Sequence, residues 1–269
     1  MVVKHNLTAM NSNRMLGLTT ASQAKSTEKL SSGYKINRAA DDAAGLAISE
    51  KMRRQVRGLT QASANAQDGI SMVQTAEGAL NEVHDMLQRI NELAVKGENG
   101  TLTASDRSYI NSEVQQLMSE IDRVASTTTF NEKNLLTGSC ANVDLQVGAE
   151  TGQHITLEIE AMSCKSIGLS GSVKDATTAG ALNTSVKAAI AKVNEQRSTL
   201  GAVQNRLEHT INNLDNIVEN TTSAEASIRD TDMANEMVKY SNNNILAQAG
   251  QAMLAQSNQA NQGVLSLLG

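Results

Sequence analysis

The chain lacks proline and tryptophan and is poor in every other aromatic residue. Its 269 residues include no Pro, no Trp, one Phe and three Tyr, whereas average usage would predict about a dozen prolines. Aromatic side chains fill thick cores and shape small-molecule pockets, so their scarcity argues against a compact globular enzyme. Long helices packed side by side need Leu, Ile, Val, Met and Ala instead. The composition therefore favours an elongated helical bundle.

Charge and hydropathy exclude further classes of protein. The formal net charge is −5 and the charges are scattered, with no basic stripe that would indicate a nucleic-acid-binding protein. No apolar run approaches the roughly 20 residues needed to span a bilayer. The N-terminal segment lacks the apolar region of a cleavable signal peptide. We therefore expect no nucleic-acid partner, no membrane partner and no such signal.

The chain also lacks the residue groupings that usually carry catalysis or metal binding. The four histidines are isolated, and no His-Glu-x-x-His pair or Gly-rich phosphate loop is present. Two cysteines, Cys140 and Cys164, are too few for a zinc site. We expect no enzymatic activity and no cofactor.

The strongest pattern in the chain is a heptad repeat between Met52 and Ala94. Every seventh residue is apolar over six repeats, and a second, largely small or apolar series starts at Ile48. A repeat of this length predicts a coiled-coil-like helix over about residues 43–96. Small residues such as Ala62, Ala66 and Gly69 imply close approach of a neighbouring helix.

The remaining segments predict further helices and one β-hairpin. Thr103 and Asp106 fit a capping box at the start of a second helix. Apolar residues at helical spacing predict a third long helix over about 179–229 and a last one over 233–268. Residues 143–147 and 154–159 alternate apolar and polar around Gly148 and Gly152, which predicts a hairpin. The expected fold is mostly α, an antiparallel helical bundle with one small hairpin near 143–160.

The two ends of the chain carry apolar stripes that the central bundle cannot cover. The stripes include Leu7, Met10, Leu16 and Leu30 near the N-terminus, and Met237, Ile245, Met253 and Val264 near the C-terminus. An isolated pair of such Asn- and Gln-rich helices is marginal in water. An unburied apolar stripe predicts a partner surface. A plain two-helix extension of the bundle is the alternative.

One linker has an unusually specific sequence. Residues 30–46 read LSSGYKINRAADDAAGL, in which Gly33 predicts a helix stop and Asp41 and Asp42 predict a new helix start. This stretch closely resembles a signature of bacterial flagellin. Further blocks of the same resemblance lie at 58–63 (GLTQAS), 65–70 (NAQDGI), 75–82 (TAEGALNE), 87–95 (LQRINELAV) and 200–207 (LGAVQNRL), with others at the C-terminus.

The resemblance implies an arrangement of domains and a function. Residues 1–43 and 230–269 are similar to the inner-tube domain that orders on assembly, and residues 44–229 are similar to the adjoining rod domain. The outer domains of longer flagellins are absent. The implied function is self-assembly into the extracellular flagellar filament for motility. The implied assembly residues are the stripe residues above together with Asn37, Arg38, Asp41, Asp42, Leu265, Leu267 and Leu268.

The resemblance also implies partners other than a second copy of the chain. These are an export chaperone on the C-terminal helix, a filament cap and hook-junction proteins. The animal Toll-like receptor that senses flagellin is a further one, and the matching receptor-contact residues are Gln88, Arg89, Glu92, Leu93 and Glu113. The alternative interpretation is that these residues form an ordinary solvent-exposed face.

Three matters stay open at the level of sequence. Cys140 and Cys164 flank the predicted hairpin and would form either a disulfide, which an extracellular protein permits, or two separate thiols. A hook–filament junction protein shares the terminal patterns, and a generic coiled-coil scaffold explains the heptads but not the ends. The blocks between Gly58 and Val95 and between Leu200 and Leu207 favour a filament subunit.

Overall fold

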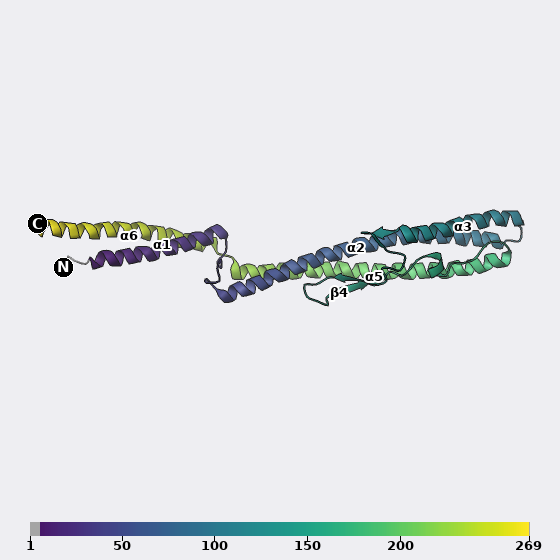
Figure 1. Cartoon of the computed structure of the whole chain (residues 1–269), viewed down its shortest axis with the longest axis horizontal. Coiled ribbons are helices and arrows are strands. Elements are labelled where there is room, and N and C mark those ends of the chain that lie inside the picture. Colours follow the sequence, from purple (N-terminus) through teal and green to yellow (C-terminus); the bar gives the residue numbers. More distant parts are fainter. Residues whose placement is uncertain (1–5, 269) are drawn as a thin grey trace. The chain divides into compact units, whose positions relative to one another are not determined.

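The computed structural model describes residues 6–268, although not the side chains of Asn261 and 263–268. Helices dominate this part of the chain (Figure 1). The helices are α1 (Leu7–Ser32), α2 (Ala43–Glu98), α3 (Ala104–Thr127), α4 (Cys164–Ile167), α5 (Ala176–Arg229) and α6 (Met233–Leu268). The strands are β1 (Thr129–Phe130), β2 (Lys133–Asn134), β3 (Val143–Gln146) and β4 (His154–Leu157). The mostly α fold expected from the sequence is confirmed.

The chain divides into two compact units. The first contains the chain up to Arg54 together with the chain from Asn220 onward, and the second contains Gln55–Glu219. The start of α2 and the end of α5 therefore belong to the first unit, and the longer remaining part of each helix belongs to the second. Each unit has its own set of packing contacts, and they are described in turn.

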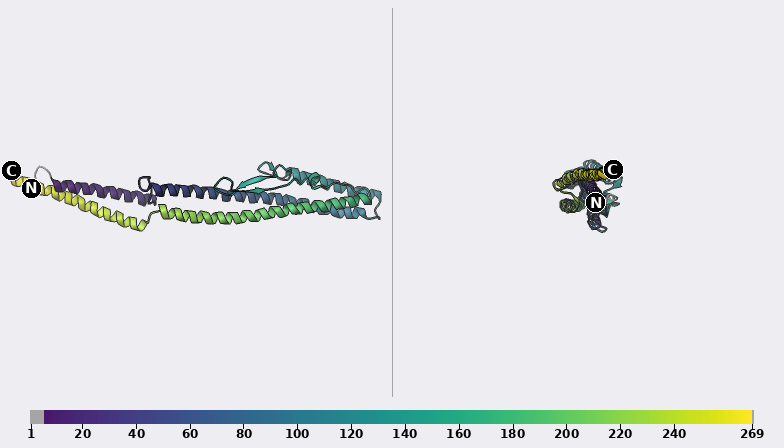
Figure 2. Two further views of the ribbon diagram at one scale, coloured as in Figure 1. Left: turned by 90° about the horizontal axis from the view of Figure 1, so that it is seen from below. Right: turned by 90° about the vertical axis from the view of Figure 1, so that its left-hand side faces the viewer.

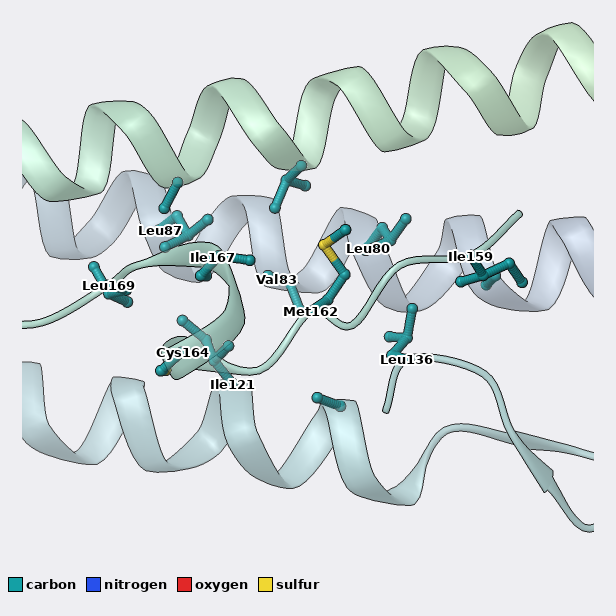
Figure 3. Close-up of a cluster of buried hydrophobic side chains, with 14 of the residues drawn as sticks. Leu80, Val83, Leu87, Ile121, Leu136, Ile159, Met162, Cys164, Ile167 and Leu169 are labelled. Carbon is teal, nitrogen blue, oxygen red and sulfur yellow. The ribbon is translucent and has the colours of Figure 1, made fainter. Parts of the chain in front are cut away.

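The core of the second unit is the predicted heptad seam. Val73, Leu80 and Leu87 of α2 are fully buried, as are Val186 and Leu200 of α5. The helix α3 adds a third apolar stripe through Ile110, Val114 and Ile121. In Figure 3, Leu87, Val83 and Leu80 follow one another along α2, and Ile121 lies on the facing helix α3. About one residue per turn of α2 is buried in this seam, which explains why the pattern is visible in the sequence.

The segment between α3 and α5 closes this core. Leu136, Ile159, Met162 and Ile167 are almost fully buried and point into the same cluster in Figure 3. The predicted hairpin is confirmed as β3 paired antiparallel with β4, with Val143 opposite Leu157. Figure 2 shows from a second side how the non-helical segment lies along the helices of this unit.

A second strand pair was not predicted. β1 and β2 pair antiparallel around Asn131 and Glu132, both with positive φ. Two consecutive residues with positive φ make the kind of tight turn that joins short hairpin strands, and Asn tolerates this conformation better than most residues. The turn contains no glycine, and glycine is the residue that most clearly predicts a positive-φ turn from sequence.

Side chains fix where the helices of the second unit begin and end. The capping box is confirmed, because Thr103 Oγ1 accepts from the Asp106 N–H and an Asp106 oxygen accepts from the Thr103 N–H. The Arg107 guanidinium then donates to the carbonyls of Gly97 and Asn99, 3.2 and 3.0 Å away. These contacts satisfy backbone groups that a helix end leaves without partners.

Candidate functional site

The first unit is built on the antiparallel pair of α1 and α6, which lie side by side in Figures 1 and 2. Its contacts are mainly polar. Ser26 Oγ donates to Glu236 Oε1 over 2.6 Å, and both side chains are buried. Asn243 Nδ2 donates to Ser22 Oγ, and Asn6 Nδ2 donates to the Ser257 carbonyl. Such contacts fix the register of two helices without burying much apolar surface.

The carboxylate of Glu236 interacts with both Ser26 of α1 and Lys239 of α6. The hydrogen bond from Ser26 lowers the pKa of its carboxyl group, and the nearby Lys239 ammonium, 3.4 Å from Oε2, acts in the same direction. Burial opposes both effects. The carboxylate is therefore ionised at neutral pH and holds two partners at once.

The apolar residues of α6 point mainly away from α1. Ile245 follows Glu236 by nine positions, which is two and a half turns of an α-helix, so it lies on the opposite side from that buried carboxylate. Ile245 is 61% exposed, whereas Ala247 is buried at 7%. The exposed apolar side chains of α6 in the described part are Met233, Met237, Val238, Ile245, Leu246 and Met253.

The helix α1 repeats this arrangement. Leu16 lies on the inner side, where a Cβ on Gly250 would contact its Cδ1 at 3.4 Å. The exposed apolar side chains of α1 are Leu7, Met10, Met15 and Leu18. We call these four residues and the six of α6 the assembly surface. Isolated exposed apolar residues need no explanation, but ten on one helix pair do.

The structure places the predicted stripe residues in three groups. Leu7, Met10, Met237, Ile245 and Met253 are exposed, as a partner surface requires. Leu16 and Leu30 are half-buried within the unit. The side chains of Val264, Leu265, Leu267 and Leu268 lie outside those that the structure describes.

Five members of the assembly surface were missed by the sequence reading. They are Met15, Leu18, Met233, Val238 and Leu246. Leu18 could have been found, because it follows Leu7 by eleven residues and therefore shares its side of the helix.

The linker after α1 is held by its own carboxylates. Gly33 ends α1 in the left-handed conformation, with φ 76°. Asp41 Oδ2 accepts from the backbone N–H groups of Asn37 and Arg38, and Asp41 Oδ1 lies 2.8 Å from Lys25 Nζ. The Lys25 contact, aided by the two amides, lowers the pKa of Asp41 to about 2.

The other predicted linker residues also make contacts within the unit. Arg38 Nε donates to Glu28 over 2.9 Å, and Asp42 Oδ1 accepts from the Gly45 N–H at the start of α2. The predicted helix stop at Gly33 and the new helix start after Asp42 are therefore confirmed. These side chains order the linker.

The two linkers of this unit are joined to each other. The Lys35 N–H donates to the Arg229 carbonyl over 2.7 Å, and the Thr231 N–H donates to the Gly33 carbonyl over 3.0 Å. The Arg229 guanidinium also lies 4.6 Å from the centroid of the Tyr34 ring, a cation–π distance. This pairing ties the end of α1 to the start of α6.

In the second unit, the patch of predicted receptor contacts forms a charged cluster. Arg89 donates to Glu113 of α3 over 2.8 Å and to Glu92 over 3.1 Å. Gln88 contacts His84 on the same helix, and all four predicted charged or polar residues are exposed. Leu93 differs, because it is only 3% exposed within the core. Leu93 nevertheless lines the groove beside Arg89, Glu92 and Glu113, although little of its surface is accessible.

The two cysteines are free and buried rather than joined in a disulfide. The Cys164 N–H donates to Asp122, and its thiol donates to the Met118 carbonyl over 3.2 Å. Burial, with the Asp122 carboxylate nearby, raises the pKa of the Cys164 thiol to about 12. A thiol of this kind is a core residue without nucleophilic character at neutral pH.

Two other kinds of feature are absent from residues 6–268 as described. Within that range no cluster of three or more His, Cys, Asp or Glu side chains could hold a metal ion. No helix of the same described range is long and apolar enough to cross a bilayer.

Comparisons with known proteins agree with the mostly helical fold just described. Residues 3–141 match the model of the bacterial flagellin N-terminal helical region, and residues 184–268 match that of the C-terminal helical region. A flagellin of Halalkalibacterium halodurans is 52% identical, with both chains covered in full. A "flagellar filament 31.3 kDa core protein" of Treponema maltophilum is 50% identical over the full length of both. The crystal structure of Bacillus cereus flagellin is 33% identical, covers 56% of this chain and 88% of its own, and superposes with a TM-score of 0.52.

Proposed function

Because this chain belongs to the bacterial flagellin family, we propose that it is the repeating structural subunit of a bacterial flagellar filament and polymerises through the assembly surface. One observation carries the proposal: ten large apolar side chains of α1 and α6 are exposed in the single chain, at 47% to 67% of their full area. A neighbouring copy of the chain would cover them. The function is structural and mechanical.

The polar pairing of α1 with α6 supports this role. Within the described part of these two helices, the buried residues are Ser26, Glu236 and Ala247. Most helical stability in proteins comes from packing of an apolar face, and here that face is turned outward. Contact with a neighbour would supply the missing burial. Contacts that do not close on themselves produce a helical filament.

The two alternatives are less well supported. A generic coiled-coil scaffold would not match the flagellin models over both ends of the chain. One full-length relative is named a flagellin and another a flagellar filament core protein, which favours a filament subunit over a hook–filament junction protein.

Seeded assembly followed by electron microscopy tests the proposal. We expect the full chain, mixed with short filament seeds, to extend them into long filaments. A variant with Leu18→Asn and Val238→Asn should not extend them, although its circular dichroism stays helical. A matched Gln251→Asn variant changes an exposed polar residue of α6 and should behave like the unaltered chain. Extension by the double variant at the unaltered rate would refute assembly through these faces.

The assembly surface also bears on how the subunit is exported and delivered to the filament. Flagellar filaments lie outside the cell, and we propose that this chain is exported to reach them. An export chaperone would cover the exposed apolar residues of α6, and cap and hook-junction proteins would meet the same helices at the filament ends. The support is the exposed apolar area of Val238, Ile245 and Leu246, which an unassembled chain leaves open to aggregation.

We further propose that the animal Toll-like receptor that senses flagellin binds the charged cluster on α2 and α3. The contacts would be Gln88, Arg89, Glu92 and Glu113, which are exposed and partly locked by ion pairs. Leu93 would support this face from below, because it is buried. A cluster held in one geometry loses little side-chain freedom on binding.

Receptor binding is tested on the unassembled full chain with the receptor ectodomain on a sensor surface. Arg89→Ala should weaken binding about tenfold, a loss of about 1.4 kcal/mol. Arg123→Ala removes a similar exposed ion pair with Glu120 on α3 and should leave binding unchanged. If both variants bind the receptor equally well, the cluster is an ordinary solvent-exposed face and the proposal is wrong.

A further inference from the structure

Methionine is unevenly distributed between exposed and buried positions. Of the eleven methionines, Met1 lies outside the described residues. Five of the other ten are exposed, and all five belong to the assembly surface: Met10, Met15, Met233, Met237 and Met253, each 47% to 63% exposed. Half of that ten-residue surface is therefore methionine.

The methionines of the second unit are placed differently. Met72 and Met162 are 5% and 1% exposed, and Met86 and Met118 are half-buried against the core. Met162 points into the apolar cluster of Figure 3. An oxidant in water would therefore reach the thioethers of α1 and α6 well before those of the core.

We propose that these five methionines form an oxidation-sensitive modification site that blocks assembly when a peroxide reaches the free subunit. The thioether sulfur attacks one peroxide oxygen, the O–O bond breaks, an S–O bond forms, and water leaves after proton transfer. The sulfur loses two electrons and hydrogen peroxide gains them. The product is a polar sulfoxide in place of an apolar side chain.

The position of the sulfoxides determines the effect. Met237 lies next to Val238, and Met10 lies one turn after Leu7, so each new S=O group enters the apolar area that a neighbouring subunit would cover. Burial of such a group without a hydrogen-bond donor is unfavourable. In the free subunit the same group remains in water, so the fold of the monomer is preserved while polymerisation is not.

Assembly would in turn protect the site. A filament that buries the ten residues excludes the oxidant from their sulfurs, so a subunit is sensitive before incorporation and resistant afterwards. This inference rests on the proposed function, because only polymerisation through the assembly surface supplies that burial.

The test treats monomeric full-length protein with hydrogen peroxide, removes the peroxide, and measures the critical concentration for seeded assembly. Peptide mass spectrometry locates each sulfoxide. We expect oxidation at the five exposed methionines before Met72 and Met162, and a critical concentration raised at least tenfold. An unchanged critical concentration after full oxidation of the five would overturn the inference. Untreated protein that forms no filaments would overturn the proposed function itself, and this inference with it.

Variants assign the effect to these residues. Replacement of all five by Leu conserves volume and apolar character, so this variant should assemble normally both before and after peroxide. Met72→Leu with Met162→Leu should remain as sensitive as the unaltered chain. Equal inhibition of the five-Leu variant by peroxide would refute the assignment. If that variant does not assemble, the oxidation rates of the unaltered monomer and filament decide: at least tenfold slower oxidation of the five in the filament supports the inference, and equal rates contradict it.

Discussion

The exposed side chain of Ile245 offers a quantitative test of assembly through α6. Replacement of Ile245 by Asn removes an apolar side chain from the side of α6 opposite Glu236. Ile and Asn have similar helix propensities, and Asn already occupies the three preceding positions. The helix should therefore persist, and the change should act on the surface alone.

The size of the effect follows from the exposed area. Complete burial of an Ile side chain is worth about 1.5–3 kcal/mol, and Ile245 has 61% of its area available in the free chain. Its burial against a neighbour therefore contributes about 1–2 kcal/mol per subunit. This corresponds to a rise of about 5- to 30-fold in the critical concentration for the Asn variant.

Sedimentation of seeded mixtures over a range of protein concentrations measures that rise. Gln251→Asn, which alters α6 without removing apolar area, should stay within twofold of the unaltered chain. The unfolding of both variants by urea should match that of the unaltered chain, since Ile245 contributes little inside the unit. An Ile245→Asn critical concentration within twofold of the control would refute burial of this residue in the filament.

Three further predictions concern the heptad seam, the linker carboxylate and the cysteines. Leu87→Ala, at a fully buried position, should lower the free energy of unfolding by about 3–5 kcal/mol in urea titrations, and a loss below 1 kcal/mol would contradict a well-packed seam. Because the folded pKa of Asp41 is about 2, below its unfolded value of about 3.9, its carboxylate stabilises the linker above pH 4. That stabilisation is lost as pH falls from about 4 to 2, so Asp41→Asn should flatten the pH dependence of thermal unfolding in this range. Cys140 and Cys164 should both react with a thiol reagent after denaturation without reductant, and only slowly in the native chain; no reactive thiol would reveal a disulfide.

The long helices were predictable because their evidence repeats. Each turn of α2 in the second unit adds another apolar residue to the same seam, so an error at one position does not move the helix. The predicted range of 43–96 compares with Ala43–Glu98 in the structure. The capping box at Thr103 was predictable for another reason, because both of its hydrogen bonds form between residues three positions apart.

The burial of Leu93 was also predictable from the sequence, because this residue lies beside the heptad seam. Leu93 follows Ile90 by three positions and Met86 by seven, and both spacings place it beside the seam. Its neighbours Arg89 and Glu92 lie one turn and one residue away and point outward. Arg89 and Leu93 are four positions apart and are therefore neighbours on the helix surface. The exposed cluster thus borders the buried seam at this point, and Leu93 lines the groove beside Arg89 and Glu113.

Tertiary contacts decided what the sequence left open. The turn at Asn131 and Glu132 depends on positive φ at two residues without glycine, so local propensity could not reveal it. Whether Cys140 and Cys164 form a disulfide or remain thiols depends on where the tertiary structure buries each side chain. Their spacing in the sequence is compatible with both states. The exposure of Met15 and Met233 likewise depends on which side of each helix meets the other.

The contrast between the two helix pairings explains how one chain can be both folded and ready to polymerise. In the second unit, the α2 seam buries Val73, Leu80 and Leu87 completely, and little large apolar area remains for a partner. In the first unit, Ser26 and Glu236 occupy a buried inner position, so α1 and α6 align while most of their large Leu, Ile and Met side chains stay exposed. An apolar contact at that position would stabilise the free pair more strongly, but it would not fix register as a buried hydrogen bond does. The polar interior of the pair and its apolar exterior are thus two consequences of the same distribution of residues along α1 and α6.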